Sequence, residues 1–134
     1  MERVYTTPLL DKLGVKPGSR VAILGVEDED FRALLADRTD DVTDGRPKRD
    51  TDLIFLAADS VDELGPIGAI QERLRPNGAI WVVSRKGKAA TLRDVDVIDA
   101  AKAVGLVDNK VVSFSAIHTA LRLVIPLARR AERG

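Results

Sequence analysis

Three short apolar segments of strand length constrain this chain more than any other feature. They are residues 20–24 (RVAIL), 53–58 (LIFLAA) and 79–84 (AIWVVS), and turn-forming or helix-patterned residues separate them. The unbroken apolar character of residues 53–58 indicates a strand that is buried on both faces. Strands that alternate with helices pair in parallel through right-handed crossovers, so the sequence predicts a mostly parallel sheet covered by helices.

Two further β-rich segments, residues 110–114 and 120–126, end the predicted fold. Too few residues lie between them for a parallel crossover, which predicts an antiparallel hairpin. A chain of 134 residues suits one domain. We therefore expect a single three-layer α/β domain over residues 1–134. Its fold is predicted to be Rossmann-like, with a mostly parallel sheet and a C-terminal antiparallel hairpin.

Capping residues mark the first two predicted helices. Thr7 and Pro8 suit the start of a short helix, and Gly14 suits its end. Residues 27–30 (EDED) place acidic groups where the dipole of the next helix is positive. The apolar side of this second helix is predicted to be Phe31, Leu34 and Leu35.

Two later helices are also predicted from their starts. Ser60 and Glu63 match a capping box, and Pro66 is expected to kink the helix that follows. Another helix begins at residues 91–94 and stops at Gly105. Its apolar stripe is predicted to be Val95, Ile98 and Ala101.

Two segments lack a clear pattern. Residues 37–52 are charged and turn-rich with only Val42 to bury, which predicts a flexible loop without a strand. Residues 128–134 (ARRAERG) are predicted to form a frayed, solvated tail.

Composition excludes several classes of function. The chain has no cysteine, which excludes disulfides and zinc–thiolate sites and favours a cytoplasmic protein. No apolar run approaches the ~20 residues of a membrane span, and the first residues do not resemble a signal peptide. Lysine and arginine total 21 against 21 aspartate and glutamate, and aromatic residues make up only 4%. Nucleic-acid binding is therefore not expected.

Particular segments resemble known families. Residues 74–84 (LRPNGAIWVVS) resemble the helix–turn–strand of class I methyltransferases, and residues 105–126 resemble their terminal hairpin. Residues 7–26 (TPLLDKLGVKPGSRVAILGV), 74–87 and 105–125 are more similar to a family of small bacterial proteins known only as a domain of unknown function. This resemblance implies a truncated methyltransferase-like topology. His118 stands where relatives of that family usually have tryptophan, and the loop SRKGKAAT replaces a longer, lysine-rich one.

The sequence lacks both features with which Rossmann-like folds bind a nucleotide cofactor, a glycine-rich loop and an acidic residue placed by a strand to contact the ribose. The loop after residues 20–24 has Gly25 alone, where a nucleotide loop needs several glycines. The acidic residues 27–30 are expected to repel a phosphate or the carboxylate of S-adenosylmethionine. Asp40, Asp41 and Asp44 could contact a ribose, but no strand is predicted to place them.

Charged residues follow two of the predicted strands at the edge where open α/β sheets bind ligands. Asp59 is either a catalytic acid or, with Ser60, part of a helix cap, and capping is the favoured interpretation. Four residues form a candidate anion rim: Arg85, Lys86, Lys88 and His118. The single histidine is expected to pack in the hairpin, Trp81 is expected to lie in the core, and no metal-site spacing is present.

We therefore expect a methyltransferase-like domain without a catalytic cofactor site. It is predicted to act by binding, with another protein or a second copy of itself as its partner. Two alternatives remain open at this stage. One is an S-adenosylmethionine-dependent methyltransferase with a divergent cofactor loop, and the other is a sensor that binds a small anion at the rim.

Overall fold

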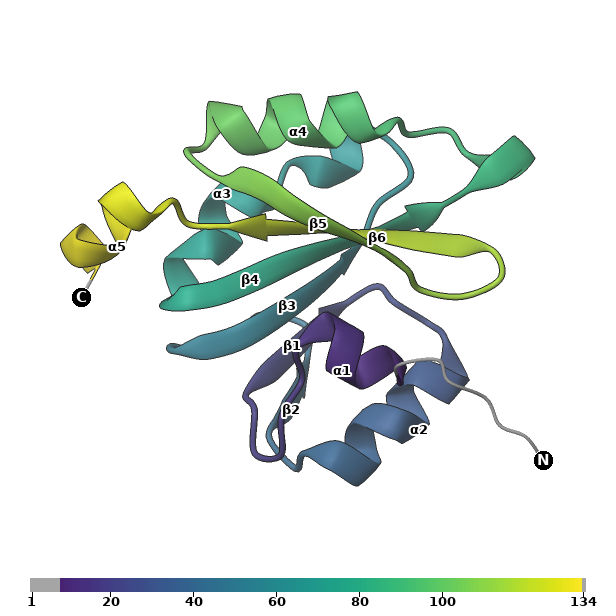
Figure 1. The fold of residues 1–134 in the computed structure, drawn as a ribbon, viewed down its shortest axis with the longest axis horizontal. Helices are drawn as coiled ribbons and strands as arrows, with labels where there is room; N and C mark the ends of the chain where they lie inside the picture. Colours follow the sequence, from purple (N-terminus) through teal and green to yellow (C-terminus); the bar gives the residue numbers. More distant parts are fainter. Residues whose placement is uncertain (1–7, 134) are drawn as a thin grey trace.

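The computed structural model describes residues 8–133, which form one twisted sheet between two layers of helices (Figure 1). The sheet has six strands in the order β2-β1-β3-β4-β6-β5. The strands are β1 (Val21–Leu24), β2 (Val42–Asp44), β3 (Thr51–Ala57), β4 (Leu74–Arg85), β5 (Val107–Ser113) and β6 (His118–Val124). Strands β1 to β4 pair in parallel, whereas β6 lies antiparallel to both β4 and β5. The predicted mixed sheet and its terminal hairpin are confirmed.

The helices cover the two faces of the sheet. Helices α1 (Leu9–Leu13) and α2 (Glu29–Arg38) pack on one face, and α3 (Ile67–Ile70) and α4 (Asp94–Ala103) pack on the other. Helix α5 (Leu127–Arg133) follows β6. Short 3-10 turns complete the connections at Asp62–Leu64, Gln71–Arg73 and Gly87–Ala89.

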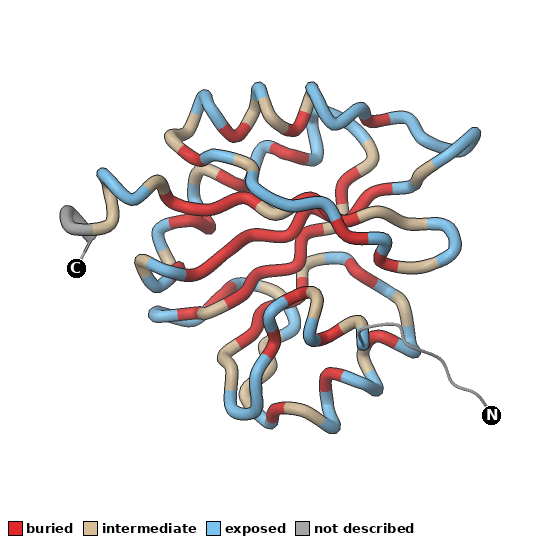
Figure 2. Tube along the Cα trace, in the orientation of Figure 1, coloured by how far each residue is buried: buried red, intermediate tan, exposed pale blue. Residues whose placement is uncertain are grey.

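Alternating strand residues build a separate core on each face, because successive side chains of a strand point to opposite sides. Phe55 and Trp81 belong to the core under α1 and α2, whereas Ile54 and Ile80 belong to the core under α3 and α4. Figure 2 shows the buried residues running along the central strands. The Trp81 indole is fully buried, and its Nε1–H donates to the carbonyl of Leu13 at 3.0 Å, so the predicted core role is confirmed.

Residues 37–52 contain a strand, so the prediction of a loop without one is wrong. Val42, Thr43 and Asp44 pair in parallel with Val21, Ala22 and Ile23. The pairing continues beyond both ends, with Val21 N–H donating to the Asp41 carbonyl at 2.9 Å and Gly45 N–H donating to the Ile23 carbonyl at 2.8 Å. A strand this short is held by backbone bonds to its neighbour, and its sequence shows no periodic apolar signal.

The order of the sheet also explains its truncation. A doubly wound nucleotide-binding sheet has the order 3-2-1-4-5-6. In this chain β2 is an edge strand and β3 lies on the other side of β1, so the third strand of that order is absent from the described residues. The chain reverses its direction of winding between β1 and β3, which makes this pair the topological switch point.

Three local predictions are corrected by the structure. In α4 the predicted stripe is correct for Ala101 and Ile98, which pack on the core, but wrong for Val95, which is exposed while Val97 is buried. Residues 127–133 form helix α5 rather than a frayed tail, and Arg129 bonds the Gly105 carbonyl. The Ser60 cap leads into a 3-10 turn instead of an α-helix.

Two further expectations concern the first helix and the turn expected within residues 74–84 from their resemblance to a helix–turn–strand. The predicted cap Thr7 lies outside the described residues, while Gly14 ends α1 as expected, with a φ of 81°. Residues 76–78 lie within β4 as an irregularity, because the pairing with β3 jumps from Leu74 opposite Thr51 to Ala79 opposite Leu53.

Among residues 8–133, no helix combines the length and the apolar character that crossing a bilayer requires.

Candidate functional site

A pocket of about 430 Å³ opens at the carboxyl ends of the parallel strands. It lies at the switch point between β1 and β3, where open α/β sheets bind their ligands. Its lining comes from the ends of β1, β3 and β4 and from the β5–β6 hairpin. We call it the carboxyl-edge pocket. The residues that line it are Gly25, Val26, Glu27, Asp28, Ala57, Asp59, Val83, Arg85, Phe114, Ile117 and His118.

The first wall of this pocket is the turn from β1 into α2. Asp28 caps the helix, and its carboxylate accepts a hydrogen bond from the Phe31 N–H at 2.9 Å. Gly25 makes the turn with a φ of 83°, a backbone conformation that favours glycine. Glu27 is exposed on the same wall. The N-terminus of α2, which could otherwise hold an anion, is therefore occupied by a carboxylate of the chain itself.

The opposite wall is a pair between the ends of β3 and β4. The Asp59 carboxylate accepts from the Arg85 backbone N–H at 2.8 Å and lies 3.4 Å from the Arg85 Nε. The Asp59 main chain is also fixed, because its N–H donates to the Glu63 carboxylate and its carbonyl accepts from the Thr91 hydroxyl. The favoured capping interpretation is correct for Ser60, whose hydroxyl accepts from the Glu63 N–H, but Asp59 instead anchors Arg85.

His118 closes the pocket from the hairpin. It begins β6 opposite Arg85 of β4, and its Nδ1 lies 3.5 Å from the Ser115 hydroxyl. The carbonyl of His118 accepts from the N–H groups of Phe114 and Ser115, so the residue is part of the tight connection between the strands. Within residues 8–133, no group of three or more histidine, cysteine or acidic side chains could hold a metal ion.

Only two of the four residues of the predicted anion rim line the carboxyl-edge pocket. Arg85 and His118 line the carboxyl-edge pocket together, but Lys86 and Lys88 do not line it. The Lys86 ammonium donates to the Ser113 hydroxyl at 2.7 Å, and Lys88 is exposed in the turn that follows β4. Carboxylates therefore outnumber cations in the pocket, and Arg85 is already paired with Asp59.

Strand β2 places one acidic residue, Asp44, at the carboxyl edge of the sheet, although the sequence pattern predicts no strand there. Asp44 ends β2 beside β1, about 20 residues after Gly25, the spacing at which nucleotide-binding folds place a ribose ligand. Its carboxylate is bonded by Arg32 at 3.1 and 3.4 Å. Asp41 lies at the other end of β2, where it pairs with Arg20, and Asp40 is exposed.

The family model described as "Protein of unknown function (DUF3052)" matches residues 10–127. The chain belongs to this family. No curated protein sequence matches the chain.

This family member has a methyltransferase-like Rossmann fold, and three solved structures are similar to it. The N-methyltransferase NodS from Bradyrhizobium japonicum WM9 is 15% identical, with a TM-score of 0.62, 88% of this chain covered and 92% of that one. A precorrin-8w decarboxylase from Methanobacterium thermoautotrophicum is 12% identical, with a TM-score of 0.60 and coverages of 87% and 86%. A TehB-like SAM-dependent methyltransferase from Corynebacterium glutamicum is 14% identical, with a TM-score of 0.55 and coverages of 88% and 85%. At such identities the likeness concerns the fold and not the activity.

Proposed function

We propose that this DUF3052 protein is a non-catalytic binding domain built on the methyltransferase fold. The observation that carries the proposal is the Asp28 carboxylate on the Phe31 N–H, at the helix terminus that faces the carboxyl-edge pocket. A cofactor carboxylate at this place would meet the carboxylates of Asp28 and Glu27, and the Phe31 N–H is already bonded. The residues present therefore do not fit the carboxylate end of S-adenosylmethionine.

The lining of the pocket favours a basic side chain of a partner protein. Glu27, Asp28 and Asp59 supply negative charge, and Arg85 is the one arginine among the lining residues. Ile117 is 64% exposed at the hairpin and offers apolar surface beside that charge. A long basic side chain combines an apolar stem with a cationic head, which matches both features.

One test measures S-adenosylmethionine directly. A ligand at 100 times its Kd stabilises a protein by ~2.7 kcal/mol, which raises the Tm of a domain of this size by several degrees. We expect millimolar S-adenosylmethionine to leave the Tm of the full chain unchanged. A rise in Tm that Asp44→Asn removes and the exposed control Asp40→Asn retains would contradict the proposal and support the divergent methyltransferase.

A second test measures the partner chemistry with a short arginine-rich peptide and a glutamate-rich peptide of equal length. We expect the basic peptide to shift the amide resonances of Glu27, Asp28 and Ile117, and Glu27→Gln to weaken its binding. Preference for the acidic peptide would contradict the proposal and favour the anion sensor, the alternative supported by the shared position of Arg85 and His118.

A further inference from the structure

A second pocket of about 430 Å³ lies at the opposite, amino edge of the sheet. The loop after α1, the start of β3, the irregular part of β4 and one residue of β6 surround it. We call it the amino-edge pocket. The residues that line it are Gly14, Lys16, Pro17, Gly18, Ser19, Asp52, Leu53, Asn77 and Arg122. None of these residues lines the carboxyl-edge pocket.

Arg122 is the unusual member of this lining. It lies in β6 between Leu121 and Leu123, opposite Trp81 of β4, so a cation stands in a strand whose neighbouring residues are buried. The Arg122 side chain is half-buried, and within residues 8–133 this side chain has neither a hydrogen bond nor an ion pair. Burial, together with the like charge of Arg130, lowers the pKa of Arg122, which nevertheless stays protonated at neutral pH.

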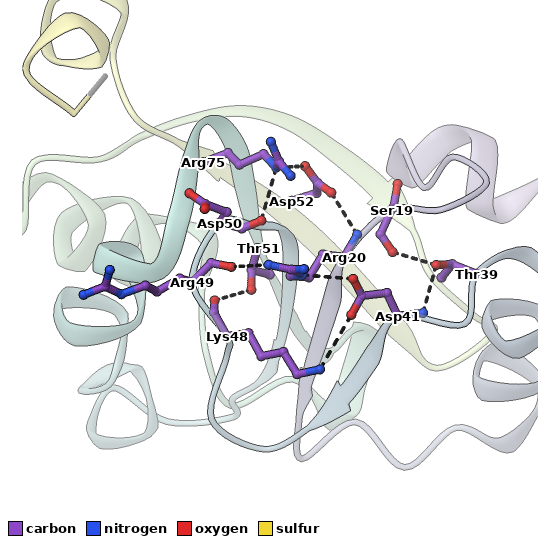
Figure 3. A network of polar contacts seen from close by, with 10 residues as sticks. All are labelled: Ser19, Arg20, Thr39, Asp41, Lys48, Arg49, Asp50, Thr51, Asp52 and Arg75. Carbon is purple, nitrogen blue, oxygen red and sulfur yellow. Dashed lines mark hydrogen bonds and ion pairs between the residues drawn. The ribbon is translucent and has the colours of Figure 1, made fainter.

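Asp52, the one acidic residue among those that line the amino-edge pocket, is bonded to other residues. Both oxygens of the Asp52 carboxylate are engaged, one by the Arg20 N–H at 2.8 Å and the other by the Arg75 Nε at 2.8 Å. Figure 3 shows this arrangement within the polar network at the amino edge. A partly desolvated cation without a partner is unfavourable, and an anion in the pocket would relieve that cost.

We propose that Arg122 and Lys16 bind an oxyanion group, a phosphate or a carboxylate of a small molecule, in the amino-edge pocket. The planar guanidinium of Arg122 suits two parallel hydrogen bonds to one oxyanion. Lys16, which is exposed at the pocket mouth, adds a second positive charge, and the amide of Asn77 adds a neutral donor. A volume of about 430 Å³ exceeds that of the oxyanion alone, so the ligand has room for a small organic group.

The experiment uses the full chain with inorganic phosphate and, separately, malonate, each against chloride at matched ionic strength. Binding is followed by the Tm and by the Nε–H resonance of Arg122. We expect at least one of the two anions to raise the Tm and shift that resonance, and the effect to weaken with added salt. The anion that binds more tightly identifies the oxyanion as phosphate or carboxylate.

Arg122→Met keeps a long side chain without the charge. We expect it to weaken anion binding at least tenfold while its Tm in chloride stays equal to that of the wild type or rises. Arg46→Met, which removes an exposed arginine from the β2–β3 loop, is the matched control and should bind as the wild type does. Lys16→Met, at an exposed position, provides a second measure if Arg122→Met folds poorly. The proposal is overturned if neither anion binds, or if both pocket variants bind as tightly as the wild type.

Discussion

The two ends of β3 carry the same motif in opposite electrostatic surroundings. Asp52 at the amino end accepts from an arginine of β4, Arg75, and Asp59 at the carboxyl end accepts from another, Arg85. Beside Asp52 the remaining charges of the pocket are positive, from Lys16 and Arg122. Beside Asp59 they are the negative carboxylates of residues 27 and 28.

The two edges of the sheet differ in how many of their charged groups have partners within the chain. The carboxyl-edge pocket has its helix terminus capped by Asp28 and its arginine paired, so the chain itself supplies the partners that a bound anion would supply. The amino-edge pocket leaves Arg122 without an ionic partner among the described residues. A net charge of zero for the whole chain conceals this separation.

The largest expected effect concerns the backbone that shapes each pocket. A Cβ on Gly78 would lie 2.7 Å from the Asp52 carbonyl, so Gly78→Ala should lower the free energy of unfolding by about 2–3 kcal/mol. A Cβ on Gly25 meets only the Ala57 Cβ at 3.4 Å, and Gly25→Ala should cost about 1 kcal/mol from its positive φ. Denaturant unfolding measures both. Gly87→Ala, with a φ of 69° and open space around it, is the control for backbone strain alone. Equal losses at Gly78 and Gly87 would contradict the predicted close contact.

A smaller effect is expected at Asp28, where two variants separate its role as a helix cap from its negative charge. Asp28→Ala removes the cap from the Phe31 N–H and should cost about 1 kcal/mol, whereas Asp28→Asn keeps a capping oxygen and should cost much less. Thermal or denaturant unfolding gives the two values. If both variants lose the same stability, the negative charge rather than the cap is what α2 requires at this position.

The smallest effect is expected at the lysines of the anion rim. Because Lys88 is exposed and the Lys86–Ser113 hydrogen bond is open to solvent, joint replacement of the two lysines by alanine should change the unfolding free energy by no more than ~0.5 kcal/mol. Phosphate binding should also be unchanged, since the proposed site lies at the other edge. A loss of phosphate binding in this double variant would move the anion site from the amino edge to the carboxyl edge.

Much of the fold follows from local sequence patterns. The apolar segments at residues 53–58 and 79–84 became β3 and β4 because buried strands need continuous apolar residues. The terminal hairpin followed from the short spacing between its strands. The acidic residues 27–30 at the start of α2 and the single Gly25 before them are equally local features, and the structure adds that Asp28 is the residue that caps the helix.

Tertiary structure alone decided β2 and the charges that meet in each pocket. Val42–Asp44 is a strand because β1 offers it an open row of backbone groups, which no feature of residues 42–44 reveals. Lys16 and Arg122 are more than 100 residues apart and share a pocket only after the sheet brings β6 beside β4. Capping residues and continuous apolar segments are patterns of residues close together along the chain, so they can be recognised in the sequence. Electrostatic pairing depends on distance in space, so only the folded chain determines which charges find partners.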